Sequence, residues 1–222
     1  MTTVAVLPVK RLGEAKRRLG DTLAGRARRT LAEAMVGDVL DALTAAAAVD
    51  AIVVVTGEPA ALALAGAVGA STVADPDDAG HVHAARRGVA WALEHGATRA
   101  LLVPGDCPSL DPAEVDALLA SASPPAPPAG AEVVVVPDRH GTGTNALVLT
   151  PPDAILPGFG PGSRARHEEA ARAAGARVRV AEPPSLLLDV DTADDLAALR
   201  VELRRRAGGA ARTRVVLAGL AP

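Results

Sequence analysis

VAVLPV, residues 4–9, is the stretch that decides the fold, because it is a short valine-rich apolar run that ends abruptly at Lys10. Such a run is typical of a buried strand. Similar runs occur at 51–56, 71–74, 99–104, 132–137, 146–149, 177–181 and 185–189, and most are separated by helical patterns. This alternation builds a mostly parallel sheet with helices on both faces. We therefore predict a single-domain α/β protein, a three-layer α/β/α sandwich over residues 1–207, with a C-terminal tail at 208–222.

The helices are predicted from apolar side chains that recur every four residues. Leu31, Met35, Val39 and Leu43 form one such stripe in a helix beginning near Gly25. Thr192 and Asp195 form a capping box at the start of the last predicted helix of the domain, which ends before 208. The other helices are expected at 59–68, 82–93, 111–120 and 163–174. The proline-rich segment 121–130 is expected to be an exposed extended loop rather than a domain boundary.

Composition excludes several classes of protein. The chain has 222 residues, a net charge of −3, one Trp, one Phe and no Tyr, which argues against a nucleic-acid partner. The single Cys107 excludes an internal disulfide or a cysteine-rich metal site, and suits a reducing cytoplasm. The first apolar run precedes the basic residues and is too short for a signal peptide or a membrane span. We expect a soluble cytoplasmic protein with no membrane partner.

Lys10 and Lys16 are the only lysines, and both lie in one short segment after the first predicted strand. All other basic positions apart from the histidines are arginine. A compact ammonium on a flexible stem follows a moving phosphate better than a planar guanidinium does. The segment therefore predicts a polyphosphate-binding loop; the alternative is a chance pair of solvated charges.

Three aspartates follow predicted strands. Asp106 comes after the run 99–104, with Gly105 before it to permit a close approach, and Asp189 and Asp191 come at the end of the run 185–189. Alternation along an extended segment would place the last two carboxylates on one side. Oxygen ligands of this kind suit Mg²⁺ and not zinc. The alternative is that Asp189 and Asp191 simply cap the following helix.

A second anion site is expected where residues 138–145 (DRHGTGTN) and 159–167 (FGPGSRARH) come together. The glycines allow backbone N–H groups to face an anion, and Ser163 begins a predicted helix whose N-terminus favours negative charge. Arg139, Arg164 and Arg166 strengthen this interpretation. The alternative is two ordinary turns followed by a capped helix.

Taken together, the motifs resemble the guanylyltransferases of coenzyme F420 biosynthesis, which activate phosphoenolpyruvate or 2-phospho-L-lactate with GTP. The resemblance runs from about Val4 to Leu199. It rests on the ordered set PVK (8–10), AKRRL (15–19), GDCP (105–108), DRHGTGTN (138–145), FGPGS (159–163) and LDVDT (188–192). It implies a nucleotidyltransferase fold of the type shared with sugar-phosphate and molybdenum-cofactor nucleotidyltransferases.

The resemblance also implies roles for individual residues. Transfer of GMP from GTP to the phosphorylated three-carbon acid would release pyrophosphate with Mg²⁺ as cofactor. Homodimer formation and hand-over of the product to the next enzyme are compatible with it. The implied catalytic residues are Lys10, Lys16, Arg18 and Asp106. The implied contacts are Lys10, Lys16 and Arg18 with the GTP phosphates, Asp106, Asp189 and Asp191 with the metal, and Thr144, Gly160 and Ser163 with phosphoenolpyruvate.

The chain departs from the family at residues 80–85. Where the family has Gly-Leu-Asn-x-Ala, this chain reads Gly80-His81-Val82-His83-Ala84-Ala85. If His83 occupies the asparagine position, an amide that donates and accepts is replaced by an imidazole, which changes the expected nucleotide contact. Two alternatives stay open from the sequence: a molybdenum-cofactor or sugar-phosphate nucleotidyltransferase, and a nucleotide-binding subunit without activity.

Overall fold

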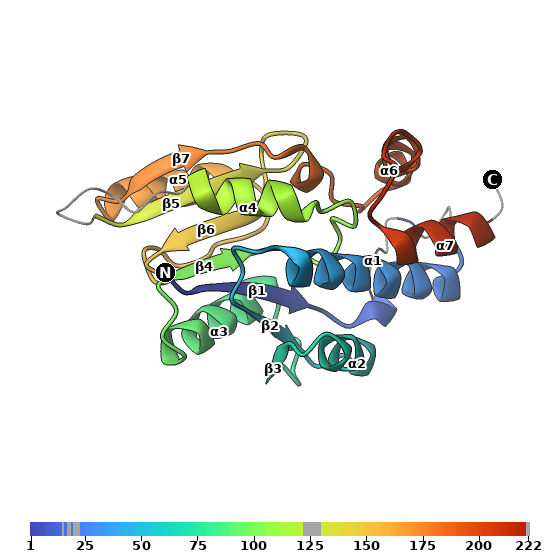
Figure 1. Ribbon diagram of the computed structural model, residues 1–222, viewed down its shortest axis with the longest axis horizontal. Coiled ribbons are helices and arrows are strands. Elements are labelled where there is room, and N and C mark those ends of the chain that lie inside the picture. Colours follow the sequence, from blue (N-terminus) through green and yellow to red (C-terminus); the bar gives the residue numbers. More distant parts are fainter. Residues whose placement is uncertain (15, 17–18, 20–22, 122–129, 221–222) are drawn as a thin grey trace.

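The computed structural model describes residues 1–14, 16, 19, 23–121 and 130–220. A seven-stranded sheet in the order β3-β2-β1-β4-β6-β5-β7 forms its centre (Figure 1). The strands are β1 (Thr3–Val9), β2 (Ala51–Thr56), β3 (Ser71–Ala74), β4 (Arg99–Leu102), β5 (Glu132–Pro137), β6 (Thr144–Thr150) and β7 (Arg177–Val180). Only β6 runs antiparallel to its neighbours, β4 and β5, within this sheet. The predicted mostly parallel sheet is confirmed.

Helices cover both faces of this sheet, as predicted. Those found in the described residues are α1 (Gly25–Ala45), α2 (Pro59–Ala67), α3 (His81–Glu94), α4 (Pro112–Ser121), α5 (Ser163–Ala173), α6 (Ala193–Arg205) and α7 (Ala211–Gly219). One apolar cluster joins the sheet to α1, α2, α4, α6 and α7, and a second joins it to α3 and α5. The three-layer sandwich follows from these two clusters.

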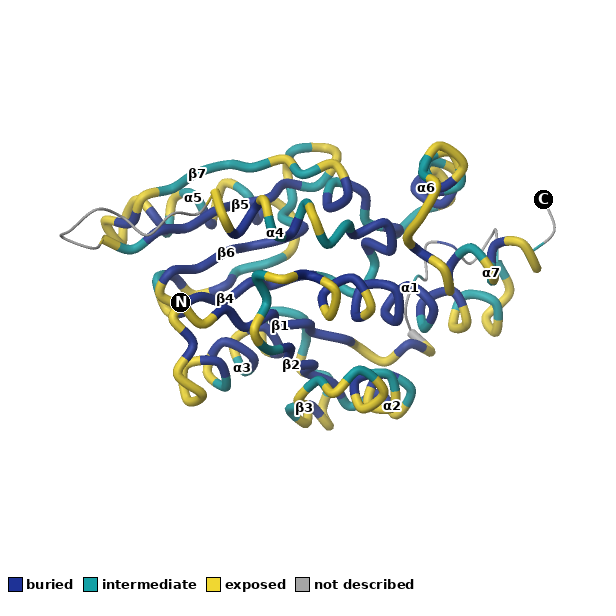
Figure 2. Tube along the Cα trace, in the orientation of Figure 1, coloured by how far each residue is buried: buried dark blue, intermediate teal, exposed yellow. Residues whose placement is uncertain are grey.

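Strand β1 shows why the sheet has two covered faces. All seven of its residues are buried, as the dark blue tube in Figure 2 shows. Ala5 and Leu7 pack in the cluster with α1, whereas Val4 and Val6 pack in the cluster with α3. Side chains alternate along a strand, so a central strand with apolar residues at every position needs a helix on each side.

The strand predicted at 185–189 is wrong. Residues Pro184–Leu186 form a 3-10 helix, and the Leu186 N–H donates to the Pro183 carbonyl at 3.0 Å. Proline has no N–H for a strand ladder, but its fixed φ suits the first position of a helical turn. The helical turn ends before the two aspartates: Leu188 and Val190 are buried in the core, whereas Asp189 and Asp191 both line one cavity, so the alternation expected for residues 188–191 is confirmed. The predicted proline-rich loop is not testable in this structure, because 122–129 lie outside the described residues.

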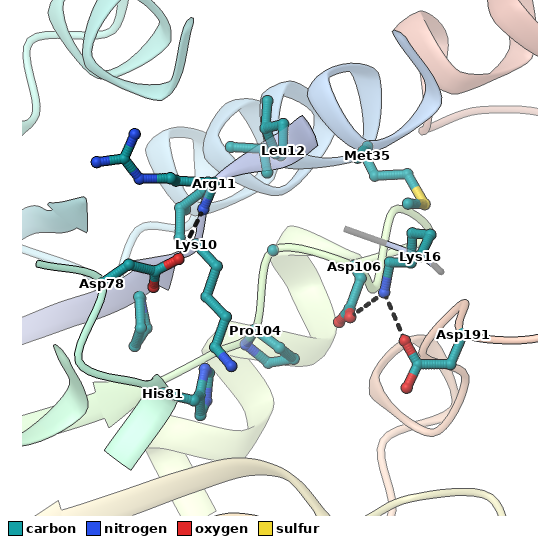
Figure 3. Close-up of a pocket in the computed structure, with 15 residues that line it drawn as sticks. Lys10, Arg11, Leu12, Lys16, Met35, Asp78, His81, Pro104, Asp106 and Asp191 are labelled. Atoms are coloured by element: carbon teal, nitrogen blue, oxygen red, sulfur yellow. Dashed lines mark hydrogen bonds and ion pairs between the residues drawn. The ribbon is translucent and has the colours of Figure 1, made fainter. Parts of the chain in front are cut away.

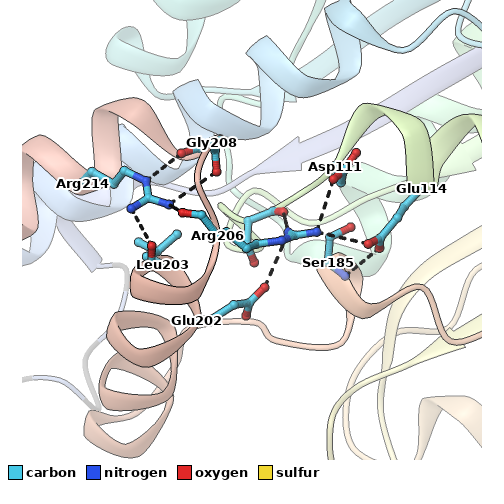
Figure 4. A network of polar contacts seen from close by, with 10 residues as sticks. Asp111, Glu114, Ser185, Glu202, Leu203, Arg206, Gly208 and Arg214 are labelled. Carbon is cyan, nitrogen blue, oxygen red and sulfur yellow. Dashed lines mark hydrogen bonds and ion pairs between the residues drawn. The ribbon is translucent and has the colours of Figure 1, made fainter.

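An arginine network fixes the segment that precedes Asp189. The Arg206 guanidinium contacts Glu114 Oε1 at 3.1 Å and donates to the Ser109 carbonyl at 2.6 Å (Figure 4). The other oxygen of Glu114 accepts from the Ser185 N–H at 2.8 Å. Arg206 follows α6, Glu114 lies on α4, and Ser185 lies in the 3-10 helix. These contacts tie the three elements together behind the site.

The tail beyond 208 contains α7, which packs on α1. The carboxylate of buried Asp38 on α1 accepts from the N–H groups of Arg212 and Thr213, at 2.9 and 2.8 Å. Leu217 is buried against the body, whereas Val215 is exposed. The tail thus contributes to the core through Leu217.

Candidate active site

Two adjoining cavities open where β1 and β4 end. The first, of about 490 Å³, is lined mainly by the segment after β1 and by the start of the loop after β4. The second, of about 670 Å³, is lined mainly by residues 142–145 and 159–163. The residues that line both are Lys10, His81, Pro104, Asp106 and Asp191. A ligand in one cavity would therefore meet a ligand in the other at these side chains.

The antiparallel direction of β6 brings Thr144 to this edge of the sheet. Leu102 of β4 pairs with Leu147 of β6 in an antiparallel register. The start of β6 therefore lies beside the carboxyl end of β4, close to the loop that carries Asp106. Strand ends of a parallel sheet collect ligand-binding residues at one edge. Here one antiparallel strand adds the beginning of its own sequence to that edge.

A lysine lies between two of the predicted metal-binding carboxylates. The Lys16 ammonium is 2.5 Å from Asp106 Oδ2 and 2.8 Å from Asp191 Oδ1 (Figure 3). Burial alone would lower the pKa of Lys16, but the two carboxylates raise it above its usual value. Gly105 permits this arrangement, because a Cβ there would lie 2.9 Å from Val36 Cγ2 of α1. Lys16 is thus an internal counter-ion in this structure.

Asp189 faces the same group of charges. Its Oδ1 accepts from Asn145 Nδ2 at 3.2 Å, and the same amide group donates to the Leu186 carbonyl at 2.8 Å. Burial and then the nearby carboxylate of Asp106 raise the pKa of Asp189 to about 6. The Val190 N–H donates to the Asp106 carbonyl at 3.1 Å, which holds the two acidic segments together. The structure therefore brings all three predicted aspartates to one place.

The donor set fits Mg²⁺. All three side chains offer hard oxygen donors, and Asp106 Oδ1 is a buried atom without a hydrogen-bond partner. Burial and then the Asp106 carboxylate raise the pKa of Asp189, and a divalent cation beside it would favour the ionised form. Among the described residues, no three acidic, histidine or cysteine side chains already surround one point at ligand spacing. The metal site stays a prediction.

The predicted phosphate-binding lysines both line the first cavity. Figure 3 shows Lys10 extending across this cavity toward His81 and Pro104. The predicted third contact, Arg18, lies outside the described residues. Arg11, which the sequence did not single out, connects this loop to the segment before α3: its guanidinium donates to the Pro76 carbonyl at 3.1 Å. A cationic wall therefore faces the first cavity.

Thr144, Gly160 and Ser163, the residues predicted to bind the acceptor, all line the second cavity. Ser163 Oγ lies 3.1 Å from Thr144 Oγ1. Phe159 lines the same cavity, and its ring packs edge-on against His81 and His167, with centroids 4.9 and 5.2 Å away. The two hydroxyls come from different elements, β6 and α5, and meet only in the folded chain.

The prediction that backbone N–H groups face an anion is wrong for three groups of the segment 138–143. The N–H groups of His140, Thr142 and Gly143 donate to the Asp138 carboxylate at 3.0 to 3.1 Å. A short acidic side chain at the start of a turn commonly accepts from the backbone that follows it. These N–H groups therefore bind the carboxylate of Asp138 within the loop and are not available to the anion of a ligand.

The three arginines predicted to strengthen this anion site are also engaged elsewhere. Arg139 pairs with Asp195 at 2.6 Å, Arg164 pairs with Glu168 at 3.0 Å, and Arg166 donates to the carbonyls of Gly158 and Pro161. None of the three lines either cavity among the described residues. Their guanidinium groups stabilise the loops around the second cavity.

His81, not His83, faces the cavities. His81 lines both of them, whereas His83 is exposed and lines neither. Burial lowers the pKa of His81, which favours the neutral ring. Both residues lie in the first turn of α3. Side chains two positions apart on a helix point in different directions, so only one of the two faces the cavities. The sequence left the role of this position open, and the structure places His81 rather than His83 at the cavities.

The lone Cys107 is fully buried, and burial raises the pKa of its thiol well above the usual range. A buried, protonated thiol is a poor nucleophile. Cys107 therefore fills space beside Asp106.

Residues 3–204 match the family model described as Guanylyl transferase CofC like. The chain belongs to this family. Membership of this nucleotidyltransferase family accounts for both the fold of the chain and the order of its acidic and basic motifs. The resemblance inferred from the motifs is confirmed over slightly more of the chain than the motifs themselves span.

Relatives support this membership along nearly the whole chain. Phosphoenolpyruvate guanylyltransferase of Conexibacter woesei is 51% identical over 98% of this chain and 96% of its own length. Phosphoenolpyruvate guanylyltransferase of Sphaerobacter thermophilus is 43% identical over 90% of this chain and 93% of its own length. A solved structure from Desulfovibrio desulfuricans G20, provisionally described as a nucleotide-diphospho-sugar transferase, has the same fold (TM-score 0.74, 18% identity, covering 99% and 95%). Of the helices described, none is long and apolar enough to cross a membrane.

His167 is the site residue that the sequence analysis missed. Its ring is buried and lies 3.0 Å from Thr144 Oγ1 through Nδ1. The sequence offered one signal: His167 lies one helical turn after Ser163, so both project from the same face of α5. That spacing is too common to identify a functional histidine by itself.

Proposed function

We propose that this protein transfers GMP from GTP to phosphoenolpyruvate and releases pyrophosphate, as a step of coenzyme F420 biosynthesis. One observation carries the proposal: two cavities meet at the same lysine and aspartates in a chain 51% identical to a phosphoenolpyruvate guanylyltransferase. GTP would occupy the first cavity and the acid the second. 2-Phospho-L-lactate has the same anionic groups and is the alternative acceptor.

The chemistry requires two anions to approach each other. A phosphate oxygen of the acceptor bonds to the α-phosphorus of GTP, and the bond from that phosphorus to the bridging oxygen of pyrophosphate breaks. The acceptor phosphate is already ionised at neutral pH, so alignment and charge neutralisation matter more than a general base. Lys10 lines both cavities and Lys16 the first, so their ammonium groups are suited to the GTP phosphates.

Mg²⁺ held by Asp106, Asp189 and Asp191 would offset the charge on the phosphate oxygens. The Lys16 ammonium that now neutralises Asp106 and Asp191 would then be available to the triphosphate. Lys16 would thus exchange the two aspartates for the phosphates of GTP, whereas a purely structural ion pair would keep its partners.

The test measures pyrophosphate release by the purified chain with Mg²⁺. GTP, ATP and CTP are offered in turn with phosphoenolpyruvate, 2-phospho-L-lactate and 3-phosphoglycerate. Release with GTP and phosphoenolpyruvate alone is expected. Release with another nucleotide or another acid would assign a different transferase, and GTP binding without release in any combination would indicate a binding subunit.

We also infer that the reaction takes place in the cytoplasm and that its activated product passes to the next enzyme of the pathway. The mixed phosphoanhydride expected as product is reactive toward water, so a short path to its consumer is an advantage.

A homodimer is compatible with the exposed Val215 and Leu156, and light scattering after gel filtration distinguishes one chain from two.

A further inference from the structure

Thr144 and Ser163 place two side-chain hydroxyls at the wall of the second cavity, next to backbone N–H groups that are already hydrogen-bonded. The loop at 138–143 gives three N–H groups to Asp138. At the start of α5, the Ser163 N–H donates to the Gly160 carbonyl at 3.0 Å, and the Arg164 N–H donates to the Thr142 carbonyl at 3.3 Å. These backbone N–H groups are not available to an acceptor anion, whereas the two hydroxyls line the cavity.

The surroundings of His167 determine which of its nitrogens carries a hydrogen. The Gly158 N–H points at Nε2 from 2.8 Å, and a backbone N–H can only donate. Nε2 is therefore the unprotonated nitrogen, and the single hydrogen of the neutral ring lies on Nδ1. Burial and then the Arg166 charge lower the pKa of His167 to about 4, so the ring is neutral at physiological pH.

In the described part of the chain, the hydrogen-bond partner of Nδ1 is Thr144 Oγ1, at 3.0 Å. Thr144 and Ser163 together carry two hydroxyl hydrogens, and the 3.1 Å contact between their oxygens uses one. Because His167 donates and needs no hydrogen from Thr144, the second hydroxyl hydrogen is left over. Thr144 and Ser163 both line the second cavity, so this hydrogen is available to a ligand there, whichever of the two hydroxyls carries it.

We propose that His167 is a positioning residue for the acceptor: by donating to Thr144, it leaves one hydroxyl hydrogen of the Thr144–Ser163 pair free to bind an anionic oxygen of the phosphorylated acid. The proposal rests on the proposed function and names a residue that acts through Thr144 without contacting the ligand. It predicts an effect on the acceptor and none on GTP.

The test compares two variants of His167. His167→Phe keeps a ring but loses both the donor to Thr144 and the acceptor of the Gly158 N–H. About a 10- to 100-fold rise in KM for phosphoenolpyruvate is expected from loss of the donor, the range for one lost buried hydrogen bond. KM for GTP should stay within about twofold, since the first cavity is untouched. His167→Asn places an amide N–H near the position of Nδ1 and should recover most of the affinity. His95→Phe, at an exposed histidine far from both cavities, is the matched control.

A double-mutant cycle with Thr144→Val shows whether His167 acts through Thr144. If it does, the double variant should have a KM for phosphoenolpyruvate less than about threefold above that of Thr144→Val alone. The proposal would be overturned if the rises in KM for phosphoenolpyruvate of the two single variants multiplied in the double variant. It would also be overturned if KM for GTP rose as much as KM for the acid. So would a His167→Asn variant as impaired as His167→Phe while its melting temperature matches that of the wild type.

Calorimetric titration with phosphoenolpyruvate alone separates this proposal from the proposed function. If the wild type binds the acid but releases no pyrophosphate, the transfer reaction is wrong while the His167 comparison still stands on binding. If the wild type is active and His167→Phe binds the acid with unchanged affinity, the proposed function holds and the role of His167 is refuted.

Discussion

At the scale of single residues, the site is organised by charge neutralisation between Lys16 and two aspartates. Lys16 has a left-handed φ of 58°, which a non-glycine residue adopts only when its surroundings compensate for the cost. Its contacts with Asp106 and Asp191 supply that compensation. A loop residue is thereby held over the strand ends, and each member of this group can be tested separately.

Asp106→Asn should lower turnover by at least about 100-fold, because an amide neither carries the charge nor binds a divalent cation as a carboxylate does. The fold should survive, since Asp106 lies at a cavity wall and Lys16 keeps Asp191 as a partner. Initial rates of pyrophosphate release and the melting temperature are the measurements. Asp153→Asn, at an exposed aspartate outside both cavities, is the control; near wild-type turnover in Asp106→Asn would remove Asp106 from the site.

Lys16→Met should raise the affinity of the free chain for a divalent cation by about tenfold, because the ammonium no longer competes for the carboxylates. Titration with Mn²⁺ followed by electron paramagnetic resonance, without nucleotide, measures this. Lys10→Met is the matched control, because no ion pair from Lys10 to these carboxylates is present in the described structure. Equal affinities for Lys16→Met and the wild type would mean that the lysine and the cation do not share a position.

His167 predicts a pH dependence of stability. Its pKa is about 4 in the folded chain and near 6.5 when unfolded, so below pH 6.5 the unfolded chain binds more protons than the folded one. The stability from this group is complete above 6.5 and is lost as the pH falls toward 4. Urea unfolding between pH 7.5 and 4.5 should show a shallower loss for His167→Gln than for the wild type. Parallel profiles would contradict a neutral buried ring.

At the scale of elements, α6 connects its own N-terminal cap to the acidic site. Thr192 Oγ1 accepts from the Asp195 N–H at 3.2 Å, and the Asp195 carboxylate accepts from the N–H groups of Thr192 and Asp191. Burial opposes ionisation of Asp195, but these hydrogen bonds and Arg139 lower its pKa overall. The capping box therefore also fixes the backbone of a predicted metal ligand.

Thr192→Ala should cost about 1 kcal/mol of unfolding free energy, the usual effect of removing a helix cap. It should also reduce turnover, since the Asp191 backbone loses part of its support. Thr192→Ser keeps the hydroxyl and serves as the matched control. Chemical denaturation and initial rates test the two effects; identical behaviour of the alanine and serine variants would show that the cap is dispensable.

At the scale of the whole molecule, residues almost 180 positions apart share one core. Asp38 of α1 accepts from two N–H groups at the start of α7, so one helix caps another across the chain. In turn, Arg214 of α7 donates to the carbonyls of Leu203 and Arg206 at the end of α6 (Figure 4). Helix α7 thereby holds α1 and α6 in fixed relation, and these two helices flank the site.

Asp38→Ala should lower the unfolding free energy by about 1 to 3 kcal/mol, because it leaves two N–H groups without their acceptor. Asp41→Ala is the matched control: its pair with Arg212 is half-exposed on both sides, and such pairs contribute less than about 1 kcal/mol. Urea denaturation compares the two variants. An equal loss of unfolding free energy in Asp41→Ala and Asp38→Ala would show that the buried cap stabilises the fold no more than the exposed ion pair does.

Much of the fold was predictable because it depends on local patterns. The valine-rich β1, the stripe of α1 and the capping box at Thr192 were all recognised from residue spacing, and each lies as predicted. The strand at 185–189 failed because its apolar residues are the same in a strand and in a buried helical turn. There the decisive signal was Pro183-Pro184, whose missing N–H groups disfavour a ladder.

The sequence by itself determined the class of fold and the residues from which the site is built, because burial periodicity and charged side-chain types are properties of the chain read in order. Only the tertiary structure decided how these groups pair. It placed Lys16 between Asp106 and Asp191, chose His81 over His83, and turned the loop N–H groups toward Asp138. The physical reason is that a hydrogen bond or ion pair depends on ångström-scale distance and direction, which contacts between distant segments set and which no spacing in one dimension records.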